Sequence, residues 1–172
     1  MLSMFFKKLL LSREANIDNG EIRLFGNNFY MQPVDELVHL HKNLSKNFGE
    51  KGLDILYESG KMSSKELFKN MERFVVKKSD MIKLFLNMLN LYGFGEVEIR
   101  NIREKKEVSL AVKNNSFAKS YFKLRGRQKS PVDNLLAGLF AGFFSELWKK
   151  NFNCKEVACI AQAKVHCQFE VK

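Results

Sequence analysis

The chain has 172 residues with a formal net charge of +10, and 45% of its residues are hydrophobic. A chain of this length buries roughly 70% of its unfolded surface, which is enough for one domain with its own core. Its three cysteines cannot all pair within the chain, which excludes a fully paired disulfide scaffold. We therefore expect one domain over residues 1–172, in which residues 1–19 form a packed N-terminal segment.

The apolar opening, MLSMFFKKLLLS, lacks the pattern of a secretory signal. Lys7 and Lys8 interrupt it, and no small-residue cleavage site follows. The longest apolar run, residues 135–144, is shorter than the roughly 20 residues that span a bilayer. We expect a protein of the reducing cytoplasm without a transmembrane segment, whose thiols are free or metal-bound.

The positive charge permits binding to polyanions, and it is densest in RNIREKK (100–106) and KLRGRQK (123–129). The other lysines are scattered along helical patterns, as on a solvated face. No helix-turn-helix, basic zipper or RNA-binding motif accompanies the two stretches. We therefore do not expect nucleic acid as the main partner, and a basic nucleic-acid-associated regulator is kept only as an alternative.

A hairpin and a helix are expected first along the chain. GEIRLFGNNFYMQP (20–33) alternates around a Gly-Asn-Asn turn signal, which predicts a hairpin. The apolar residues of 34–48 have helical spacing, with Gly49 as the cap. His39 and His41 lie two apart and so face different sides of this helix, which favours surface histidines over paired ligands.

Three helices are expected next. Residues 52–60 predict a short helix that ends at Gly60, and residues 63–78 a second one with Ser63 or Ser64 as its N-cap. Residues 79–93 are apolar over more than half of the helix circumference. Such a helix is buried on two sides or lines an apolar cavity.

Residues 96–102 and 107–114 alternate and predict a second hairpin, and 116–122 a short helical turn. The clearest helix, residues 130–150, begins with Ser130 as N-cap and Pro131 at the first position. Its Gly138 and Gly142 lie four apart on one face, where a backbone or a ligand approaches closely. Tight packing is the usual reason for such a pair, and a ligand is the alternative.

The chain ends in two strands, residues 151–160 and 164–172. A hairpin centred on Ala163 would place Cys159 directly opposite Cys167. The order of elements is then hairpin, helices, hairpin, helix, hairpin. This order predicts an α+β domain in which an antiparallel sheet packs against a helical layer.

All three cysteines, Cys154, Cys159 and Cys167, lie in this closing segment together with Glu156. Thiolates and a carboxylate are donors that Zn²⁺ accepts, usually four at a time. The alternative is that Cys159 and Cys167 are small buried hydrophobic residues. Strict alternation puts Cys154 and Glu156 on the face opposite Cys159, so Glu156 joins the site only if the strand bulges or turns.

Several motifs together resemble one family. The chain resembles the 4-vinyl-reductase-type domain, which also occurs as archaeal hydrocarbon-binding proteins. The resemblance is carried by the spacing of Glu156, Cys159 and Cys167 at the end of the chain and by four segments, GLDILYESGK, LYGFGEVEI, VKNNSFAKSY and SPVDNLLAGLFAGFFSELW. The resemblance extends from about Gly20 to Val171 and depends mainly on the order of the elements. It implies a fold related to the subunits of the eukaryotic transport particle (TRAPP).

The resemblance also implies a zinc site. In ligand-sensing relatives a cysteine at the start of the long helix, a glutamate and two cysteines hold the ion, and the last three match Glu156, Cys159 and Cys167. The helix position matches Asp133, which departs from the cysteine. Asp133 or Cys154 would be the fourth ligand, although Asp133 also suits the helix N-terminus without a metal.

For function, the resemblance implies a sensor or carrier of a small apolar ligand, such as a hydrocarbon, an acyl chain or an isoprenoid, that pairs as a homodimer. Sixteen phenylalanines and seven methionines provide apolar lining, although most of them belong to the core. Phenol sensors hold their ligand with a histidine and a tryptophan, and this chain has Leu84 and Val112 at the matching places. The expected lining residues are Phe85, Met88, Leu89, Phe117, Tyr121, Leu135, Gly138, Leu139, Gly142 and Phe143.

An enzyme that reduces a vinyl or tetrapyrrole substrate is the alternative that the family name raises. A reductase needs a hydride source, and no glycine-rich dinucleotide turn lies between a strand and a helix. GFGEVE (93–98) is the nearest pattern, and it leads into a strand. We therefore expect a binding protein rather than an enzyme, and we assign no catalytic residues.

Overall fold

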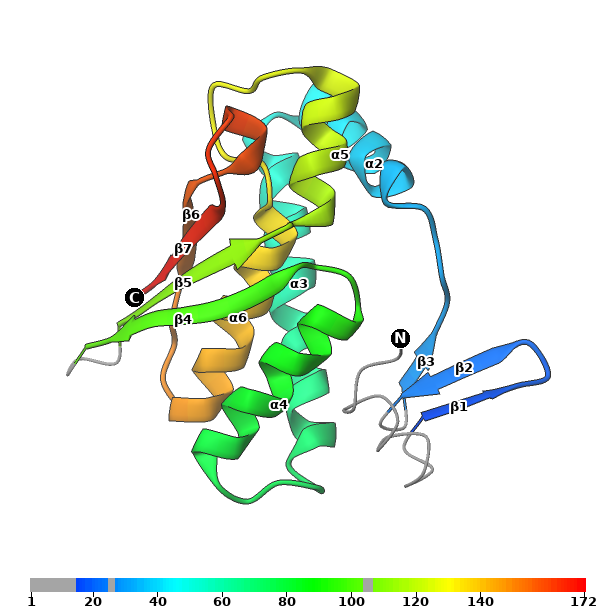
Figure 1. Ribbon diagram of the computed structural model, residues 1–172, viewed down its shortest axis with the longest axis vertical. Helices are drawn as coiled ribbons and strands as arrows, with labels where there is room; N and C mark the ends of the chain where they lie inside the picture. Colours follow the sequence, from blue (N-terminus) through cyan, green and yellow to red (C-terminus); the bar gives the residue numbers. More distant parts are fainter. Residues whose placement is uncertain (1–14, 25–26, 104–106) are drawn as a thin grey trace.

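The computed structural model describes residues 15–24, 27–103 and 107–172, which form two antiparallel sheets and a layer of helices (Figure 1). The first sheet has the order β1-β2-β3 and the second β4-β5-β7-β6. The expected α+β class with antiparallel pairing is confirmed. The strands are β1 (Ala15–Asp18), β2 (Glu21–Leu24), β3 (Asn27–Phe29), β4 (Glu96–Ile102), β5 (Val108–Lys113), β6 (Cys154–Ala158) and β7 (Cys167–Val171). The helices are α2 (Val34–Phe48), α3 (Glu50–Met71), α4 (Lys78–Leu91), α5 (Ser116–Arg125), α6 (Asn134–Trp148) and the 3-10 turn η1 (Ile160–Gln162).

Helix α6 is at the centre of the core. Eleven of its 15 residues are buried, because it packs against α3 and also contacts β6 and β7 of the four-stranded sheet. Its Phe140 ring meets Phe169 of β7 at a centroid distance of 5.1 Å, and its Phe143 ring stacks on Phe85 of α4 at 3.8 Å. Aromatic contacts of this kind hold the helical layer to the sheet. Figure 1 shows α3, α4 and α6 together beside this sheet.

Helix α3 is continuous where the sequence predicts two helices. The expected break at Gly60 is wrong, since Gly60 lies inside α3 and is buried. A Cβ built at this glycine would overlap the carbonyl oxygen of Leu135 just inside α6. Gly60 is therefore explained by the close approach of a distant helix rather than by a helix end.

Gly138 and Gly142 make the matching contact from α6. A Cβ at Gly138 would overlap the carbonyl oxygen of Tyr57, and one at Gly142 that of Lys61. Both oxygens belong to the backbone of α3, so neither glycine opens onto a ligand. Tight packing is therefore the reason for this pair of glycines, and the expectation that they line a ligand site is wrong.

The N-terminal sheet exceeds the predicted hairpin by one strand. The hairpin of 20–33 corresponds to β2 and β3, whereas residues 15–18 of the expected packed segment 1–19 form β1, and residues 1–14 lie outside the described part of the chain. The turn between β1 and β2 has Asn19 and Gly20 at positive φ, 49° and 81°. Asn-Gly is a strong signal for such a turn, and it was available in the sequence.

Two local expectations differ near the later helices. Helix α6 begins at Asn134 with Asp133 as its N-cap, so Pro131 is not its first residue and Ser130 is not its cap. Helix α5 extends to Arg125 instead of ending after a short turn.

The expected strand over 96–102 is confirmed as β4. Within the described ranges, none of the helices combines the length and the apolar character needed to cross a membrane.

His41 is buried, contrary to the expectation of a surface residue. It is 5% exposed and its ring lies against Phe117 and Tyr121, with centroid distances of 5.7 and 5.1 Å. Burial lowers the pKa of His41, because the charged imidazolium loses its solvation. His39 is exposed, as expected, and its Nδ1 lies 3.1 Å from a guanidinium nitrogen of Arg125.

We predict that Gly142→Ala destabilises the protein by about 1–3 kcal/mol, because the added methyl group forces α6 away from α3. Glu58→Ala on the exposed side of α3 is the control and should change stability by less than about 0.5 kcal/mol. Thermal or urea unfolding measures both. Equal stability of the two variants would contradict a tight contact at Gly142.

Candidate metal centre and neighbouring pocket

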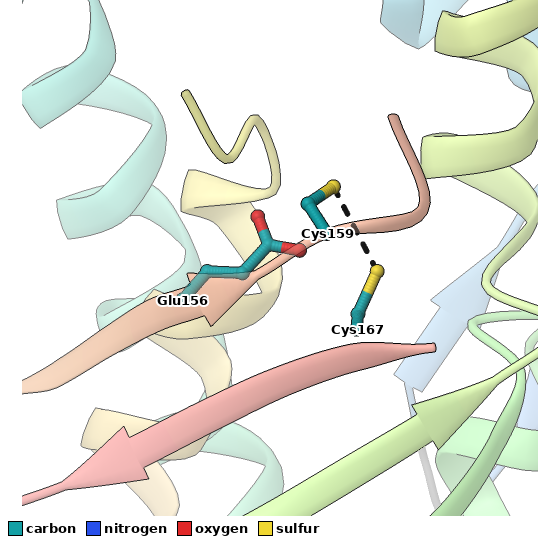
Figure 2. A group of neighbouring side chains, drawn as sticks. All are labelled: Glu156, Cys159 and Cys167. Atoms are coloured by element: carbon teal, nitrogen blue, oxygen red, sulfur yellow. Dashed lines mark hydrogen bonds between the residues drawn. The ribbon is translucent and has the colours of Figure 1, made fainter. Parts of the chain in front are cut away.

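Glu156, Cys159 and Cys167 converge at one end of the closing hairpin. One ligand atom from each residue lies within 4.8 Å of the other two, and the two Sγ atoms are 3.8 Å apart. Figure 2 shows the carboxylate and both sulfur atoms close together, beside the end of β6 and the beginning of β7. Both cysteines have no exposed surface. We call these three residues the Glu-Cys-Cys group.

A bulge in β6 brings Glu156 to the side of the thiols. Ala158 pairs with Gln168, as a turn centred on Ala163 requires, but Glu156 pairs with Phe169, so the register shifts between the two pairs. The extra residue, Val157, breaks the strict alternation. The sequence-based expectation that Glu156 reaches the thiols only through a bulge or turn is confirmed.

The Glu156 carboxylate also joins β6 to the beginning of α6. Its Oε2 accepts hydrogen bonds from the backbone N–H groups of Val132 and Asp133, at 2.9 and 2.8 Å. A carboxylate is stabilised there by the unsatisfied N–H groups that precede a helix. Its Oε1 is buried and has no hydrogen-bond partner among the described residues. That oxygen is the donor atom left for a cation.

The acidic groups in this space change one another's pKa values. Burial, followed by the nearby Cys159 thiolate, raises the pKa of Glu156 to about 8. The hydrogen bond from Cys167 lowers the pKa of Cys159, and the same bond raises the pKa of Cys167. Negative charges this close repel one another, whereas a bound dication would stabilise all three. Thiolates and a carboxylate are donors that suit Zn²⁺.

Asp133 and Cys154, the two candidates for a fourth ligand, are outside the Glu-Cys-Cys group. Asp133 is 3% exposed; its Oδ1 accepts from the N–H of Leu136 at 3.1 Å and its Oδ2 from the Asn115 side chain at 2.7 Å. Burial, followed by the Glu156 charge, raises the pKa of Asp133 to about 7. Both of its oxygens are therefore used at the start of α6, one of them in capping the helix.

Cys154 is buried at the start of β6, where it pairs with Val171. Its backbone N–H donates to the Tyr57 hydroxyl at 3.0 Å, and burial raises the pKa of its thiol. A thiol whose pKa burial has raised behaves as a small hydrophobic side chain. The structure thus brings together three of the five expected metal ligands.

A half-open cavity of about 360 Å³ lies between β3, α3, α4 and the first turns of α6. The expected ligand-lining residues Leu89, Leu135 and Leu139 border it. The complete lining consists of Asn27, Asn28, Phe29, Gly60, Ser63, Glu66, Leu67, Leu89, Tyr92, Phe94, Leu135 and Leu139. A cavity of this size and apolar character is typical of sites for small molecules.

The other expected lining residues lie elsewhere. Phe85, Met88 and Phe143 are fully buried in the core. Phe117 and Tyr121 pack around the His41 ring at the contact of α2 with α5. These five side chains do not border the cavity. Their apolar character and helical spacing did not distinguish core from pocket, because both need the same residues.

Tyr92, which sequence reasoning counted only as an apolar residue of its helix, is one of the residues that line the cavity. Its Oη is buried and has no hydrogen-bond partner within the described ranges. Burial raises the pKa of Tyr92, so the hydroxyl stays protonated. The sequence held one signal that could have drawn attention to Tyr92: it stands at the end of an apolar helix and directly precedes Gly93-Phe94-Gly95.

The two basic stretches of the sequence are separated in space. Figure 1 shows the end of β4, which begins the first stretch, at the lower left and the end of α5, which begins the second, at the top. Residues 104–106 of the first stretch lie outside the described part of the chain. The described basic residues of these stretches therefore do not form one continuous patch.

The closing third of the chain matches a known family. Residues 112–172 match the model of the 4-vinyl-reductase-type domain. An uncharacterized protein of Methanocaldococcus jannaschii, MJ1460, is 32% identical over 121 residues, which cover 68% of this chain and 64% of that relative. The closing region of the chain is thus similar to the 4-vinyl-reductase-type family. The chain spans a little less than two thirds of the length of this relative, and the expected family resemblance is confirmed.

Solved structures share the fold of this chain. The phenol-responsive sensory domain of the transcription activator PoxR, solved with phenol, has a TM-score of 0.83 and 18% identity and covers 100% of this chain and 91% of its own. A vinyl-4-reductase family protein of M. jannaschii has a TM-score of 0.51 and 23% identity over 83% of this chain and 96% of its own. Trafficking protein particle complex subunit 3 of Naegleria fowleri, covalently bound to palmitic acid, has a TM-score of 0.56 and 12% identity over 81% of this chain and 93% of its own. The expected relation to the transport-particle fold is confirmed.

The region that matches the family contains all of the candidate metal centre but only a small part of the cavity. It contains the whole Glu-Cys-Cys group and the two cavity residues of α6, Leu135 and Leu139. Tyr92 and the cavity residues of β3 and α3 precede it. The candidate metal centre is thus part of the matched region, whereas most of the cavity is built by the preceding segment.

We predict that Asp133→Ala destabilises the protein by about 2 kcal/mol, because α6 loses its cap and the Asn115 side chain loses its partner. Asp133→Asn is the matched control: it keeps an acceptor for Leu136 and loses only the acceptor for Asn115, so it should cost less than Asp133→Ala. Urea unfolding measures both. Similar losses in the two variants would contradict the capping role.

Proposed function

We propose that this chain is a small-molecule sensor or carrier whose closing hairpin is stabilised by a structural zinc ion. The cavity between β3, α3, α4 and α6 carries the binding function, because apolar side chains from all four elements line it. The shared fold supports the same function, since one neighbour is a phenol-responsive sensory domain and another holds palmitic acid. Three buried free cysteines suit a reducing compartment, and we propose a cytoplasmic location.

Zinc is the metal that we propose for the Glu-Cys-Cys group. Two thiolates and one carboxylate supply soft and hard donors that Zn²⁺ accepts together. Glu156 would bind the ion through Oε1 while its Oε2 stays on the N–H groups before α6. The ion would then link β6, β7 and the long helix, and its contribution would be to folding.

Mass spectrometry of small molecules extracted from the protein, purified from its native host, tests the binding function. We expect an apolar compound in stoichiometric amount. A matched preparation of Gly142→Ala tests whether retention needs the intact contact between α3 and α6. Protein that carries no compound, and that no apolar compound stabilises in thermal melts, would contradict the proposal.

We predict about one zinc ion per chain after expression with zinc, measured by elemental analysis. Cys159→Ser and Cys167→Ser should lose the ion and melt well below wild type, because binding and folding are coupled. Cys154→Ser and Asp133→Asn are the matched controls, since their side chains lie outside the Glu-Cys-Cys group. Loss of zinc from either control would identify a fourth ligand, and metal-free wild type would refute the site.

We also predict a homodimer. Leu40 and Phe48 of α2 are 48% and 59% exposed, and Ile55 and Met62 of α3 are 51% and 63% exposed. Leu40 and Phe48 are eight residues apart, and Ile55 and Met62 are seven apart, so the two members of each pair lie on one side of their helix. Exposed apolar faces of this kind are typical of interfaces.

Sedimentation at micromolar concentration tests the dimer. The double variant Leu40→Asp and Phe48→Asp should sediment as a monomer, because charge on the α2 face opposes association. Val157→Asp changes an exposed apolar residue of β6 and should leave the dimer intact. A monomeric wild type would overturn the prediction.

A further inference from the structure

An open hollow lies where the loop after α5 meets the turn before β7. It has a volume of about 440 Å³ and shares no lining residue with the apolar cavity. Figure 1 shows the loop (yellow) beside the turn (orange-red), at the top of the molecule. The lining residues are Arg127, Gln128, Lys129, Gln162 and Lys164. The hollow is therefore separate from the site to which we assign the apolar ligand.

Hydrogen bonds hold the two walls of this hollow together. The backbone N–H of Gln128 donates to the Ala161 carbonyl at 2.8 Å. The Gln162 side chain donates across the hollow to the Lys129 carbonyl at 3.0 Å. On the α5 side, the Gln128 side chain also donates to the Gly126 carbonyl at 3.0 Å. The backbone is thus fixed before a ligand binds, which lowers the entropic cost of binding.

The charge of this hollow is unbalanced. Three of its described lining residues are cationic, Arg127, Lys129 and Lys164, and none is acidic. All three are exposed, so a ligand in the hollow can reach them, and within the described ranges none of them forms an ion pair. Like charges around one hollow repel one another, and a bound anion would offset that repulsion.

A second polar hollow, on the four-stranded sheet, is balanced in charge. Its volume is about 390 Å³, and its lining includes two cationic and two acidic residues. Arg103 pairs with Glu107 at 3.3 Å, and Lys172 pairs with Glu170 at 2.7 Å. The cations of this second hollow are satisfied within the chain, whereas those of the hollow beside α5 are available to a ligand.

Three available cations favour a ligand that carries several negative charges. Arginine binds a phosphate group through two parallel hydrogen bonds, and lysine binds it as a compact point charge. A diphosphate group matches three cations more closely than a monovalent carboxylate does. Figure 1 shows the other basic stretch of the sequence far from this end, so an extended polyanion would find no continuous basic track between them. The arrangement therefore favours a small phosphorylated molecule over a nucleic acid.

We propose that the hollow between Arg127, Lys129 and Lys164 binds a small molecule through a phosphate-bearing group with two or more negative charges, such as a diphosphate. The inference goes beyond the proposed function, because it concerns a second, polar ligand at a separate place. The held backbone positions the three cations, and their charges supply the affinity.

Titration of the full chain with inorganic diphosphate tests the site. Calorimetry at low salt should show one diphosphate per chain, bound more tightly than inorganic phosphate and far more tightly than acetate, because the attraction grows with ligand charge. Raising the NaCl concentration from about 20 mM to about 200 mM should weaken binding severalfold by screening. Elemental analysis of the recovered protein checks that diphosphate has not removed a metal.

Variants locate the binding. Arg127→Gln and Lys164→Gln should each weaken diphosphate binding about three- to fivefold, and the double variant about tenfold or more, as expected for exposed ion pairs that act together. Arg103→Gln is the matched control: it removes the same charge from an exposed arginine that is already paired with Glu107. It should leave diphosphate affinity unchanged, and thermal melts check that all variants are folded.

Two results would overturn this site. The first is a wild type that does not bind diphosphate, even if it binds duplex DNA or vesicles of phosphatidylserine and phosphatidylcholine, because the occupant would then not be a small molecule. The second is an equal loss of affinity in Arg103→Gln and Arg127→Gln, because net charge rather than the hollow would then bind the anion. Both results leave the proposed function standing, since the compound extracted from the native host tests the apolar cavity separately.

Discussion

The close backbone contact between α3 and α6 is the constraint on which the rest of this structure depends. Gly60 on one helix and Gly138 and Gly142 on the other lack the Cβ atoms that would separate the two backbones. Small residues at a helix crossing permit this approach, and larger ones forbid it. The contact fixes the position of α6, and with it both the N–H groups that precede the helix and the cavity wall formed by Leu135 and Leu139.

The geometry of the candidate metal centre follows from where α6 begins. Glu156 would be costly to bury alone, but one of its oxygens accepts two N–H groups before α6 and the other remains for a cation beside two thiols. The bulge at Val157 puts the carboxylate on the side of Cys159 and Cys167. Asp133 caps the same helix and so is not free to bind the ion in this arrangement.

The start of α6 also links the two sites of the chain. Asp133 stands next to the carboxylate of the candidate metal centre, and Leu135, two residues later, borders the cavity. The cavity is also lined by β3 and by the end of α4, where the rings of Phe29 and Tyr92 lie against each other. A structural ion that holds the beginning of α6 would therefore also hold one wall of the proposed binding site.

Local patterns in the sequence predicted the hairpins, the long helix and the position of Cys159 near Cys167, because turn chemistry, periodicity and strand register act between residues near in the chain. Glu156 was expected to join these thiols only through a bulge or turn, and the bulge at Val157 is seen in the structure. The continuation of α3 through Gly60 and the packing role of Gly142 follow from the contact between α3 and α6, which local patterns do not contain. The burial of the Tyr92 hydroxyl likewise depends on the tertiary structure. Each of these depends on a distant segment that covers the residue, and local patterns carry no record of what will cover them.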